Sequence, residues 1–338
     1  MRIFEAAKIC CDRLGLLAVY HRLVNRDTLT VVMFHRVLPD SGLADADPDY
    51  AMSDGLFAKC LAFFRRHYAI VGLDALLAAQ GGGEPLPSRA LLITFDDGWD
   101  DNLEFAVPLL AAQAVPAVVF AATDAVTNDQ NWWWQEVLLS AFRRGQASYE
   151  TLWQAIPGDW SSLRTVERPL RLLLRYGAGD PDIRRRVLAR YVVDGARRHM
   201  LTVERLRSLA DAGIAVGSHG AGHLPLSLIG DPEADIERSR RALAEALPGR
   251  VGAAFSFPHG RHSPRAIAAA FAAGFRLLFT SDPIVNKVVK GLPPAILGRI
   301  EIPAGQIADR FGRLQRHRLA AWMFLRPRRL LARVASAR

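Results

Sequence analysis

The stretch 91-LLITFDDGWDDN-102 places four aspartates directly behind a run of apolar residues. This run has the length and the β-branched content of a buried strand. Asp96 and Asp97, the first two acids, are adjacent, and burying an unpaired carboxylate costs several kcal/mol. The pair therefore either lies in a solvated turn with Gly98, or a positively charged group lies between the two carboxylates.

Strand and helix patterns alternate on both sides of this stretch. Helices are predicted between the strands, for example at 57–68 and 232–247. Such alternation implies parallel strands joined by right-handed crossovers, and therefore either a barrel or an open doubly wound sheet. Residues 128–200 carry no strand signal and are predicted to form a helical insertion. The predicted strands cover residues 29–37, 69–73, 90–95, 117–123, 214–219, 253–258, 275–281 and 299–303.

The composition is typical of a folded protein from a reducing compartment. Half of the 338 residues are apolar, and the three cysteines include the adjacent pair Cys10 and Cys11, so a disulfide framework is not expected. Residues 1–28 carry charges throughout, which predicts an amphipathic helix and not a secretion signal. No charge-free run of about 18 residues suits a membrane-spanning helix. We expect a soluble or peripheral protein.

The net charge of +9 is concentrated at one end of the chain. Residues 310–338 contain nine arginines and no acid, with Trp322, Phe324 and Leu325 among the apolar residues between them. A basic amphipathic segment of this kind fits the surface of an anionic membrane. The alternative is a helix that packs its apolar side on the domain. Nucleic acid is not an expected partner, because the charge is terminal and no recognition motif accompanies it.

Polar residues follow four of the predicted strands. In parallel α/β folds the carboxyl ends of the strands meet at one edge, where active sites form. Segments that are far apart in the chain are therefore expected to converge there. The residues concerned are His35, Asp96, Asp97, His219, His223 and His259.

The spacing of His219 and His223 is common for two ligands of one metal ion. Glycines at 220 and 222 predict that the pair lies in a loop and not on a helix. Two histidines leave such a site one protein ligand short of the usual three, and an aspartate would complete it while leaving a position open for water. Asp96 and Asp97 can supply that ligand and a second carboxylate for proton transfer. A divalent cation would also allow both acids to be ionised side by side.

The order TFDDG, then SHGAGHLPLS, then FSFPHG resembles the polysaccharide deacetylase family, carbohydrate esterase family 4 with its NodB-type homology domain, over roughly residues 29–305. The resemblance implies a distorted (β/α) barrel with fewer strands than the eightfold type. It also implies a divalent metal, commonly zinc, and hydrolysis of N-acetyl groups on amino sugars. Carried over to this chain, Asp96 is the general base, and Asp97, His219 and His223 are the metal ligands.

The chain departs from the family's pattern at two places. The third motif usually carries an arginine two residues before its proline, which orients the base, and this chain has Ser256 there. The late histidine that often serves as general acid is missing, and the segment LGRIEIP offers Arg299 instead. The general acid is left open between His35 and His259. The resemblance further implies that the backbone amide of His259 binds the oxyanion.

Two other runs attract attention. The three tryptophans at 132–134 cannot all face one way, so we expect at least one in the core and another at the wall of the cleft, with the insertion packed against the barrel. The Asp-Asp-Asn run at 100–102 is expected to cap the helix that follows it.

These features predict a metal-dependent deacetylase acting on N-acetylhexosamine units of a polysaccharide, such as an exopolysaccharide, or of its lipid-linked precursor. Its predicted parts are an amphipathic helix (1–28), the barrel (29–305) and a basic amphipathic tail (306–338). The chain is expected in the cytoplasm, where the basic tail and the amphipathic N-terminal helix would hold it at the inner face of the membrane. Two alternatives stay open: a hydrolase on the same scaffold that acts on another amide or an O-acetyl ester, and a glycan-binding protein without turnover.

Overall fold

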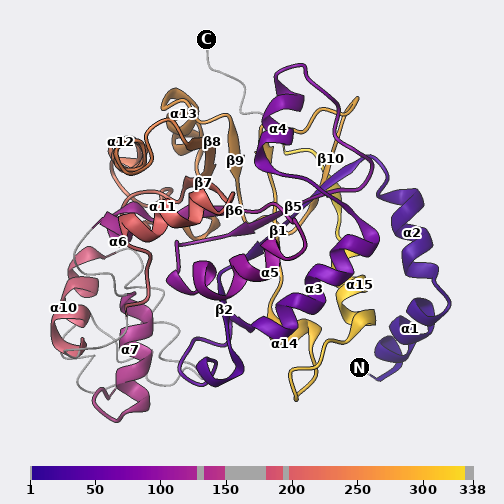
Figure 1. The fold of residues 1–338 in the computed structure, drawn as a ribbon, viewed down its shortest axis with the longest axis horizontal. Coiled ribbons are helices and arrows are strands. Elements are labelled where there is room, and N and C mark those ends of the chain that lie inside the picture. Colours follow the sequence, from indigo (N-terminus) through magenta and orange to yellow (C-terminus); the bar gives the residue numbers. More distant parts are fainter. Residues whose placement is uncertain (1, 128–132, 149–179, 193–197, 332–338) are drawn as a thin grey trace.

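The computed structural model describes residues 2–127, 133–148, 180–192 and 198–331, and a curled, mostly parallel sheet lies at its centre (Figure 1). Six neighbouring strands run parallel in the order β9-β8-β7-β6-β5-β1. Each overlaps a stretch that the sequence predicts as a strand, so the predicted α/β class is confirmed. The strands are β1 (Thr28–Phe34), β5 (Ala90–Phe95), β6 (Val118–Ala121), β7 (Ala215–Ser218), β8 (Val251–Ser256) and β9 (Leu277–Phe279).

One short segment joins the two edges of this parallel sheet. Its first half, β11 (Ile296–Leu297), pairs with β9, and its second half, β12 (Ile300–Glu301), pairs with β1. Gly298 lies between the halves, where an added Cβ would be 2.3 Å from the Ile284 side chain and 2.6 Å from the Asp282 carbonyl oxygen, so only glycine fits. The sheet thereby becomes the predicted distorted barrel, and Arg299 lies at its seam.

The remaining strands are short. β4 (Ala69–Ile70) pairs with β5, β10 (Val285–Lys287) runs antiparallel to β1, and β13 (Arg328–Arg329) lies beside β10. β2 (Arg36–Leu38) and β3 (Ala51–Ser53) form a separate small sheet. The sequence does not predict β3, β10, β11 or β13, because two or three residues are too few to show an alternation of polar and apolar positions.

Helices pack around the barrel, most of them on its outside, and several begin at a capping residue. Ser53 accepts a hydrogen bond from the Leu56 amide, and Thr202 accepts one from the Arg205 amide. The helices are α3 (Asp54–His67), α4 (Leu73–Gln80), a π-helical turn (Asn102–Ala106), α5 (Val107–Ala111), α6 (Thr123–Thr127), α11 (Val203–Asp211), α12 (Pro232–Ala246) and α13 (Pro264–Ala272), with short 3₁₀ turns at Asp40–Gly42 and Pro258–Gly260.

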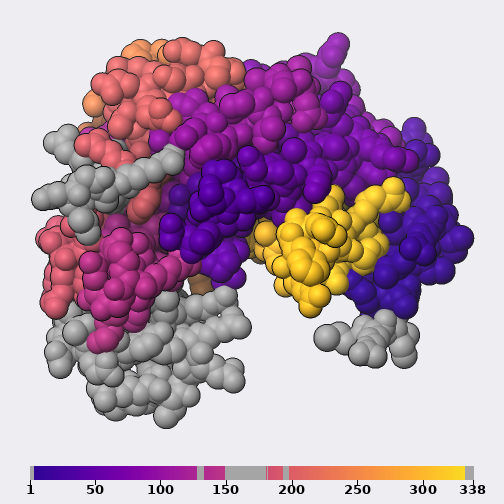
Figure 2. Space-filling view, turned by 60° about the horizontal axis from the view of Figure 1, so that its bottom comes forward, coloured from indigo at the N-terminus to yellow at the C-terminus, as the bar shows by residue number. Residues whose placement is uncertain are grey.

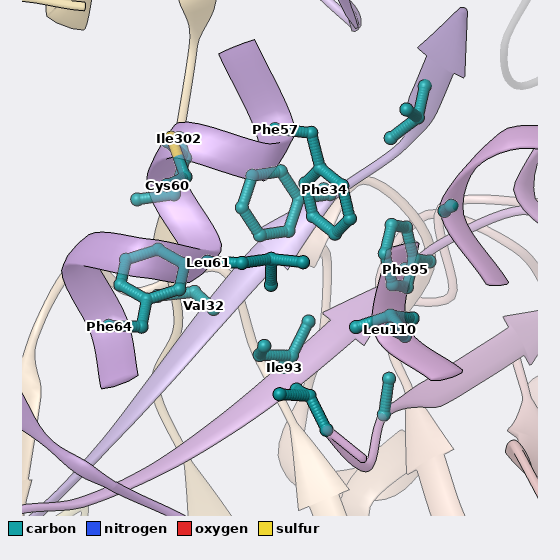
Figure 3. Close-up of a cluster of buried hydrophobic side chains, with 14 of the residues drawn as sticks. Val32, Phe34, Phe57, Cys60, Leu61, Phe64, Ile93, Phe95, Leu110 and Ile302 are labelled. Atoms are coloured by element: carbon teal, nitrogen blue, oxygen red, sulfur yellow. The ribbon is translucent and has the colours of Figure 1, made fainter. Parts of the chain in front are cut away.

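Along the strands, alternate residues face the barrel interior and its outside, where separate cores form. Val32 and Ile93 point outward and pack with Phe57 and Phe64 of α3 in the cluster drawn in Figure 3. Their neighbours on the strands, such as Leu92, point into the barrel and pack with side chains of α4. Each fully buried side chain of this size stabilises the fold by about 1.5–3 kcal/mol. The interior core fills one end of the barrel and leaves the carboxyl ends of the strands for polar residues.

The predicted helical insertion falls partly outside the described residues. Within them, α7 (Trp134–Arg143) and α10 (Pro181–Tyr191) pack against each other through a small cluster of their own, which includes Leu138 and Val187. Residues 149–179 lie outside the part of the chain that the structure describes.

The two ends of the chain pack together beside the barrel. The stretch predicted as one amphipathic helix forms two, α1 (Arg2–Arg13) and α2 (Leu16–Val24), because the backbone at Gly15 has a φ of 72°. The predicted tail begins within the short helix α14 (Ala304–Ile307) and also forms α15 (Arg316–Phe324). In Figure 1, α15 lies between α3 and the α1–α2 pair.

Helix α15 buries its apolar side. Leu319, Met323 and Phe324 lie in the main outer core, so this helix packs on the domain, whereas Leu325 and Leu330 beyond it are 51% and 54% exposed. Among the described residues, no helix combines the length and the apolar content that crossing a bilayer demands.

Candidate metal centre and active site

The polar residues at the carboxyl edge continue the inward-facing side of their strands. On β5 the side chains of Ala90 and Leu92 face the barrel interior, and Asp96 follows in the same alternation. His219 stands in the corresponding place after β7, as Ser256 does at the end of β8. The strands therefore deliver these side chains to one point, as the sequence predicts.

Asp97, His219 and His223 form a buried group that could hold a metal ion. One potential ligand atom from each residue lies within 4.8 Å of the other two. Oδ1 of Asp97 is 3.5 Å from Nε2 of His219 and 3.2 Å from Nε2 of His223. Among the described residues, this is the only group of three His, Cys, Asp or Glu side chains with such spacing.

The hydrogen bonds around the group leave its ligand atoms free. Nδ1 of His219 is 2.8 Å from the Ser256 carbonyl oxygen, which fixes the proton on Nδ1 and leaves the lone pair of Nε2 facing the centre. The Trp99 indole donates to Oδ2 of Asp97 at 2.9 Å, whereas the buried Oδ1 has no hydrogen-bond donor among the described residues. Burial lowers the pKa of His219 to about 4, so its imidazole is neutral at pH 7. Two imidazoles and one carboxylate fit Zn²⁺ or a similar divalent ion with a position left open.

The loops that carry the group are strained and held in place. Asp97 and His223 have φ values of 76° and 50°, a region that residues other than glycine rarely adopt. The Asp235 carboxylate accepts hydrogen bonds from the amides of Ala221 and Gly222, both at 2.9 Å. These contacts fix the turn between the two histidines.

Asp96 is held by Arg299, the residue at the seam of the barrel. The guanidinium donates from Nη1 to Oδ1 at 2.6 Å and from Nη2 to Oδ2 at 2.7 Å, and it also donates to the Ser256 hydroxyl at 2.8 Å. Burial raises the pKa of Asp96, but the charge of Arg299 and its hydrogen bonds bring it below its usual value. The buried carboxylate is therefore ionised and fixed in orientation, 3.7 Å from Nε2 of His219.

The contact between Arg299 and Asp96 is the feature of the site that the sequence did not predict. Ser256 occupies the place where the family's pattern has an arginine, and Arg299 reaches the same carboxylate from a segment 43 positions further along the chain. The segment LGRIEIP contains a feature that could have predicted this contact: Arg299 follows a glycine and directly precedes a short apolar strand. A charge at such a position needs a buried partner.

The two candidate acids lie at different depths of the same cavity. This cavity has a volume of about 190 Å³, and its lining includes His35, His259, Tyr50 and Glu301. His35 is half-buried, and its ring is 4.9 Å from that of Tyr50. His259 is exposed, with its ring 4.3 Å from that of His223 and a φ of 56°.

The tryptophan run is confirmed where the structure describes it. Trp134 is buried in the cluster between α7 and α10. Trp133 lines the cavity, with its ring 4.8 Å from His223 and 5.4 Å from Trp99. One tryptophan is thus core and another is a cleft wall, while Trp132 lies outside the described residues.

The expected helix cap at 100–102 is wrong. The Asp101 carboxylate does not cap the following turn and instead accepts hydrogen bonds from Arg36 Nε at 2.8 Å and from the Val37 amide at 3.2 Å. Asp100 pairs with Arg205. Arg36 also lies 4.4 Å from the centre of the Trp99 ring. Asp101 therefore holds Arg36 against Trp99, whose indole donates the hydrogen bond to Asp97.

Three solved structures share this fold with the chain. The deacetylase PplD of Streptococcus pyogenes, solved in complex with acetate, has 15% identity and a TM-score of 0.56 over 88% of this chain and 99% of that one. IcaB from Ammonifex degensii has 20% identity and a TM-score of 0.55 over 88% and 97%. A de-N-acetylase from Aggregatibacter actinomycetemcomitans has 17% identity and a TM-score of 0.53 over 81% and 94%.

No curated protein matches the sequence of the chain. The family model described as polysaccharide deacetylase matches residues 83–278, which is more than half of the chain. This range contains the aspartate pair, both histidines of the metal group and Ser256. With the barrel and the convergent edge already described, the match shows that this chain belongs to the polysaccharide deacetylase family.

Proposed function

We propose that the protein is a metal-dependent hydrolase that removes N-acetyl groups from N-acetylhexosamine units of a glycan. The observation that carries the proposal is the pairing, in one cavity, of a carboxylate fixed by Arg299 with the group Asp97, His219 and His223. The de-N-acetylase among the structures of similar fold supports an amide as the target.

Each side chain has a defined task in this proposal. Asp97, His219 and His223 hold the divalent ion, which when bound polarises the acetamide carbonyl and makes water more acidic. Asp96 takes a proton from the attacking water, and Arg299 keeps its carboxylate ionised and aimed at that water. As the new C–O bond forms, the negative charge on the carbonyl oxygen is stabilised by the backbone amide of His259.

The final step needs a proton donor for the leaving nitrogen. When the C–N bond breaks, the amine leaves with the sugar and the acyl group leaves as acetate, so one proton must reach the nitrogen. We assign this task to His35, because it is half-buried within the cavity and follows β1 on the inward-facing side that Val31 and Met33 share. His259 is exposed, which suits a residue at the cavity entrance better than a proton donor.

The size of the cavity bears on the substrate. Its volume of about 190 Å³ is below the roughly 300–1,000 Å³ typical of pockets that enclose a drug-sized ligand. We therefore propose that one sugar unit enters while the rest of the glycan stays outside. An exopolysaccharide or its lipid-linked precursor meets this requirement, and we propose that the chain meets it in the cytoplasm, at the inner face of the membrane.

The alternative of an inactive glycan-binding protein loses its main support. That alternative rests on the missing motif arginine, and Arg299 now makes the bidentate contact with the base that such an arginine is expected to make. A hydrolase that acts on another amide or an O-acetyl ester differs in substrate and not in machinery, so activity assays must separate it.

Acetate release by the full-length protein loaded with zinc tests the proposal. We expect release from N-acetylglucosamine oligomers by the wild type, little from O-acetylated xylan, and a loss of at least about a hundredfold in Asp96→Asn, which keeps the shape of the side chain but cannot accept the proton. Faster release from the xylan would favour the esterase, and equal activity in Asp96→Asn would contradict the assigned base.

A further inference from the structure

The outward face of α2 carries apolar side chains that remain exposed. Leu16, Val19 and Leu23 follow one another at intervals of three and four residues, with Tyr20 beside them, so they share one side of the helix. Leu23 is 73% exposed, and Leu14, just before the helix, is 67% exposed. A surface helix ordinarily turns polar residues to solvent, so this face calls for an explanation.

The opposite face of α2 already has its partner. Leu17 and His21 are buried, the His21 ring stacks on Phe324 of α15 at 4.1 Å, and Asn25 donates a hydrogen bond to the Phe324 carbonyl oxygen at 3.0 Å. Figures 1 and 2 show α2 at the edge of the molecule, with α15 on its inner side. The helix is therefore firmly attached while its second apolar face points away from the protein.

Arginines border this apolar face. Arg13 lies at the end of α1, and Arg22 and Arg26 lie at the far end of α2, all of them exposed. Arg328, also exposed, donates a hydrogen bond to the Val24 carbonyl oxygen at 2.7 Å, so it is fixed at the same end of the helix. The face is thus bordered by cationic side chains at both of its ends.

The acids of this region do little to neutralise the border. Asp12 pairs with Arg316 of α15 at 3.0 Å, and Glu5 pairs with Arg318. Asp27 is exposed, but it directly follows Arg26 and leaves the net charge of the border positive. The surface offered to solvent is therefore apolar in the middle and basic around it.

We propose that this face of α2 docks on a membrane surface that contains anionic lipids. The leucines and Val19 enter the boundary between headgroups and acyl chains, and the arginines contact lipid phosphates. A second copy of the chain is a poorer occupant, because a symmetric contact would bring two basic borders together. The docking face is thus on α2 and not on α15, because the apolar side chains of α15 are buried in the main outer core. The inference does not depend on the proposed catalysis.

Co-sedimentation of the full chain with lipid vesicles tests this inference. We expect binding to vesicles of phosphatidylcholine with roughly a third phosphatidylglycerol, weak binding to phosphatidylcholine alone, and weaker binding in high salt. The double variant Leu16→Gln/Leu23→Gln should bind at least about tenfold more weakly, because two inserted side chains lose their apolar surface. The double variant Arg22→Glu/Arg26→Glu should bind more weakly than the wild type to the anionic vesicles, and its weak binding to phosphatidylcholine vesicles should be unchanged.

The matched control is Leu228→Gln, which makes the same exchange at a leucine that is 76% exposed in the loop before α12. Figure 1 shows α12 on the opposite side of the molecule from α2. Unchanged thermal unfolding and unchanged acetate release from a soluble oligomer show that the α2 variants stay folded. Failure of the wild type to bind anionic vesicles, or an equal loss in Leu228→Gln, overturns the inference. The inference is also overturned if the wild type does not bind vesicles but sediments as a dimer, and if Leu16→Gln/Leu23→Gln sediments as a monomer. That result would assign the face to a second copy of the chain.

Discussion

Asp96 and Arg299 form a fully buried pair whose two hydrogen bonds fix the plane of the carboxylate. Arginine matters here for its shape as well as its charge, because a lysine presents a single ammonium and cannot hold both oxygens at once. The pair therefore decides where the lone pairs of the base point. Changes at Arg299 should affect catalysis without affecting the metal ligands.

We predict that Arg299→Lys lowers kcat about a hundredfold, since misplacement of a catalytic group by about 1 Å can have that effect. Metal content should stay at the wild-type level, because Asp97 and His219 keep their own hydrogen bonds and none of the three ligands contacts Arg299 through one. Ser256→Ala, which removes only one contact of the guanidinium, is the matched control and should lower kcat a few-fold. A wild-type kcat in Arg299→Lys would show that the pair has no positioning role.

At His35 the prediction concerns the proton for the leaving amine. His35→Gln should lower kcat for an N-acetylglucosamine oligomer by about 10²–10⁴. It should leave the hydrolysis of 4-nitrophenyl acetate nearly unchanged, because that leaving group departs without protonation. His259→Gln serves as the comparison and should affect the two substrates alike. The opposite pattern between the two variants would assign the acid to His259.

At the scale of elements, the segment that closes the barrel depends on one amide side chain. The Asn286 amide donates to the carbonyl oxygens of Gly298 and Leu29 and accepts from the Gly298 amide, all within 3.1 Å. These bonds tie β10 to the seam directly beside Arg299. Weakening the seam should therefore reduce both stability and activity.

We expect Asn286→Ala to lower the free energy of unfolding by about 3 kcal/mol, because it leaves buried backbone groups without partners. Its kcat should fall as well, since Arg299 loses its support. Chemical denaturation and acetate release measure the two effects. The control is Gln113→Ala, whose amide bonds to Arg65 at the surface and whose loss should cost less than about 0.5 kcal/mol. A similar loss of stability in both variants would argue against the role of the seam.

The contact between α2 and α15 should be sensitive to acid. Burial lowers the pKa of His21 to about 4, below its ordinary value of 6.5. The unfolded chain therefore binds a proton more readily than the folded one, and this contribution to stability is complete above about pH 6.5 and lost as the pH falls toward 4. Burial also lowers the pKa of His67, whose carbonyl oxygen lies 3.2 Å from the His21 ring, so both histidines make stability depend on pH in the same sense.

From these values the wild type should lose about 2 kcal/mol of stability between pH 8 and pH 5 through His21 alone. His21→Gln cannot take up a proton and should show a smaller loss over the same interval. Urea denaturation at the two pH values measures the difference. Equal pH dependence in the variant and the wild type would mean that His21 does not titrate as proposed.

At the scale of the whole molecule, the sequence predicted the barrel and the convergence of its edge. Six strands could be predicted because each lies in a mainly apolar stretch, and the convergence of their edge because polar residues follow them. The metal group could be predicted from the spacing of His219 and His223 together with the family resemblance. Arg299 could not be assigned, since its partner lies 203 positions away in sequence and only the closure of the barrel brings them together. Asp101 was misassigned because a cap and a buried ion pair use the same residue type.

The terminal helices show a second limit of sequence reasoning. Both ends of the chain read as amphipathic, and only their mutual packing decides which apolar face is covered. The structure covers the face of α15 and leaves that of α2 exposed. Patterns along one segment cannot predict this outcome, because it depends on contacts between segments about 300 residues apart.

Metal content per chain tests the central claim most directly. The protein is stripped with a chelator, dialysed against zinc and analysed by mass spectrometry, for the wild type, Asp97→Ala and Asp96→Asn. The structure predicts one ion per chain in the wild type and in Asp96→Asn, and almost none in Asp97→Ala, because Asp97 is the one acid among the described residues that turns an oxygen toward both imidazoles. A full complement of zinc in Asp97→Ala, held as tightly as in the wild type, would contradict the assignment of the metal centre and of the chemistry built on it.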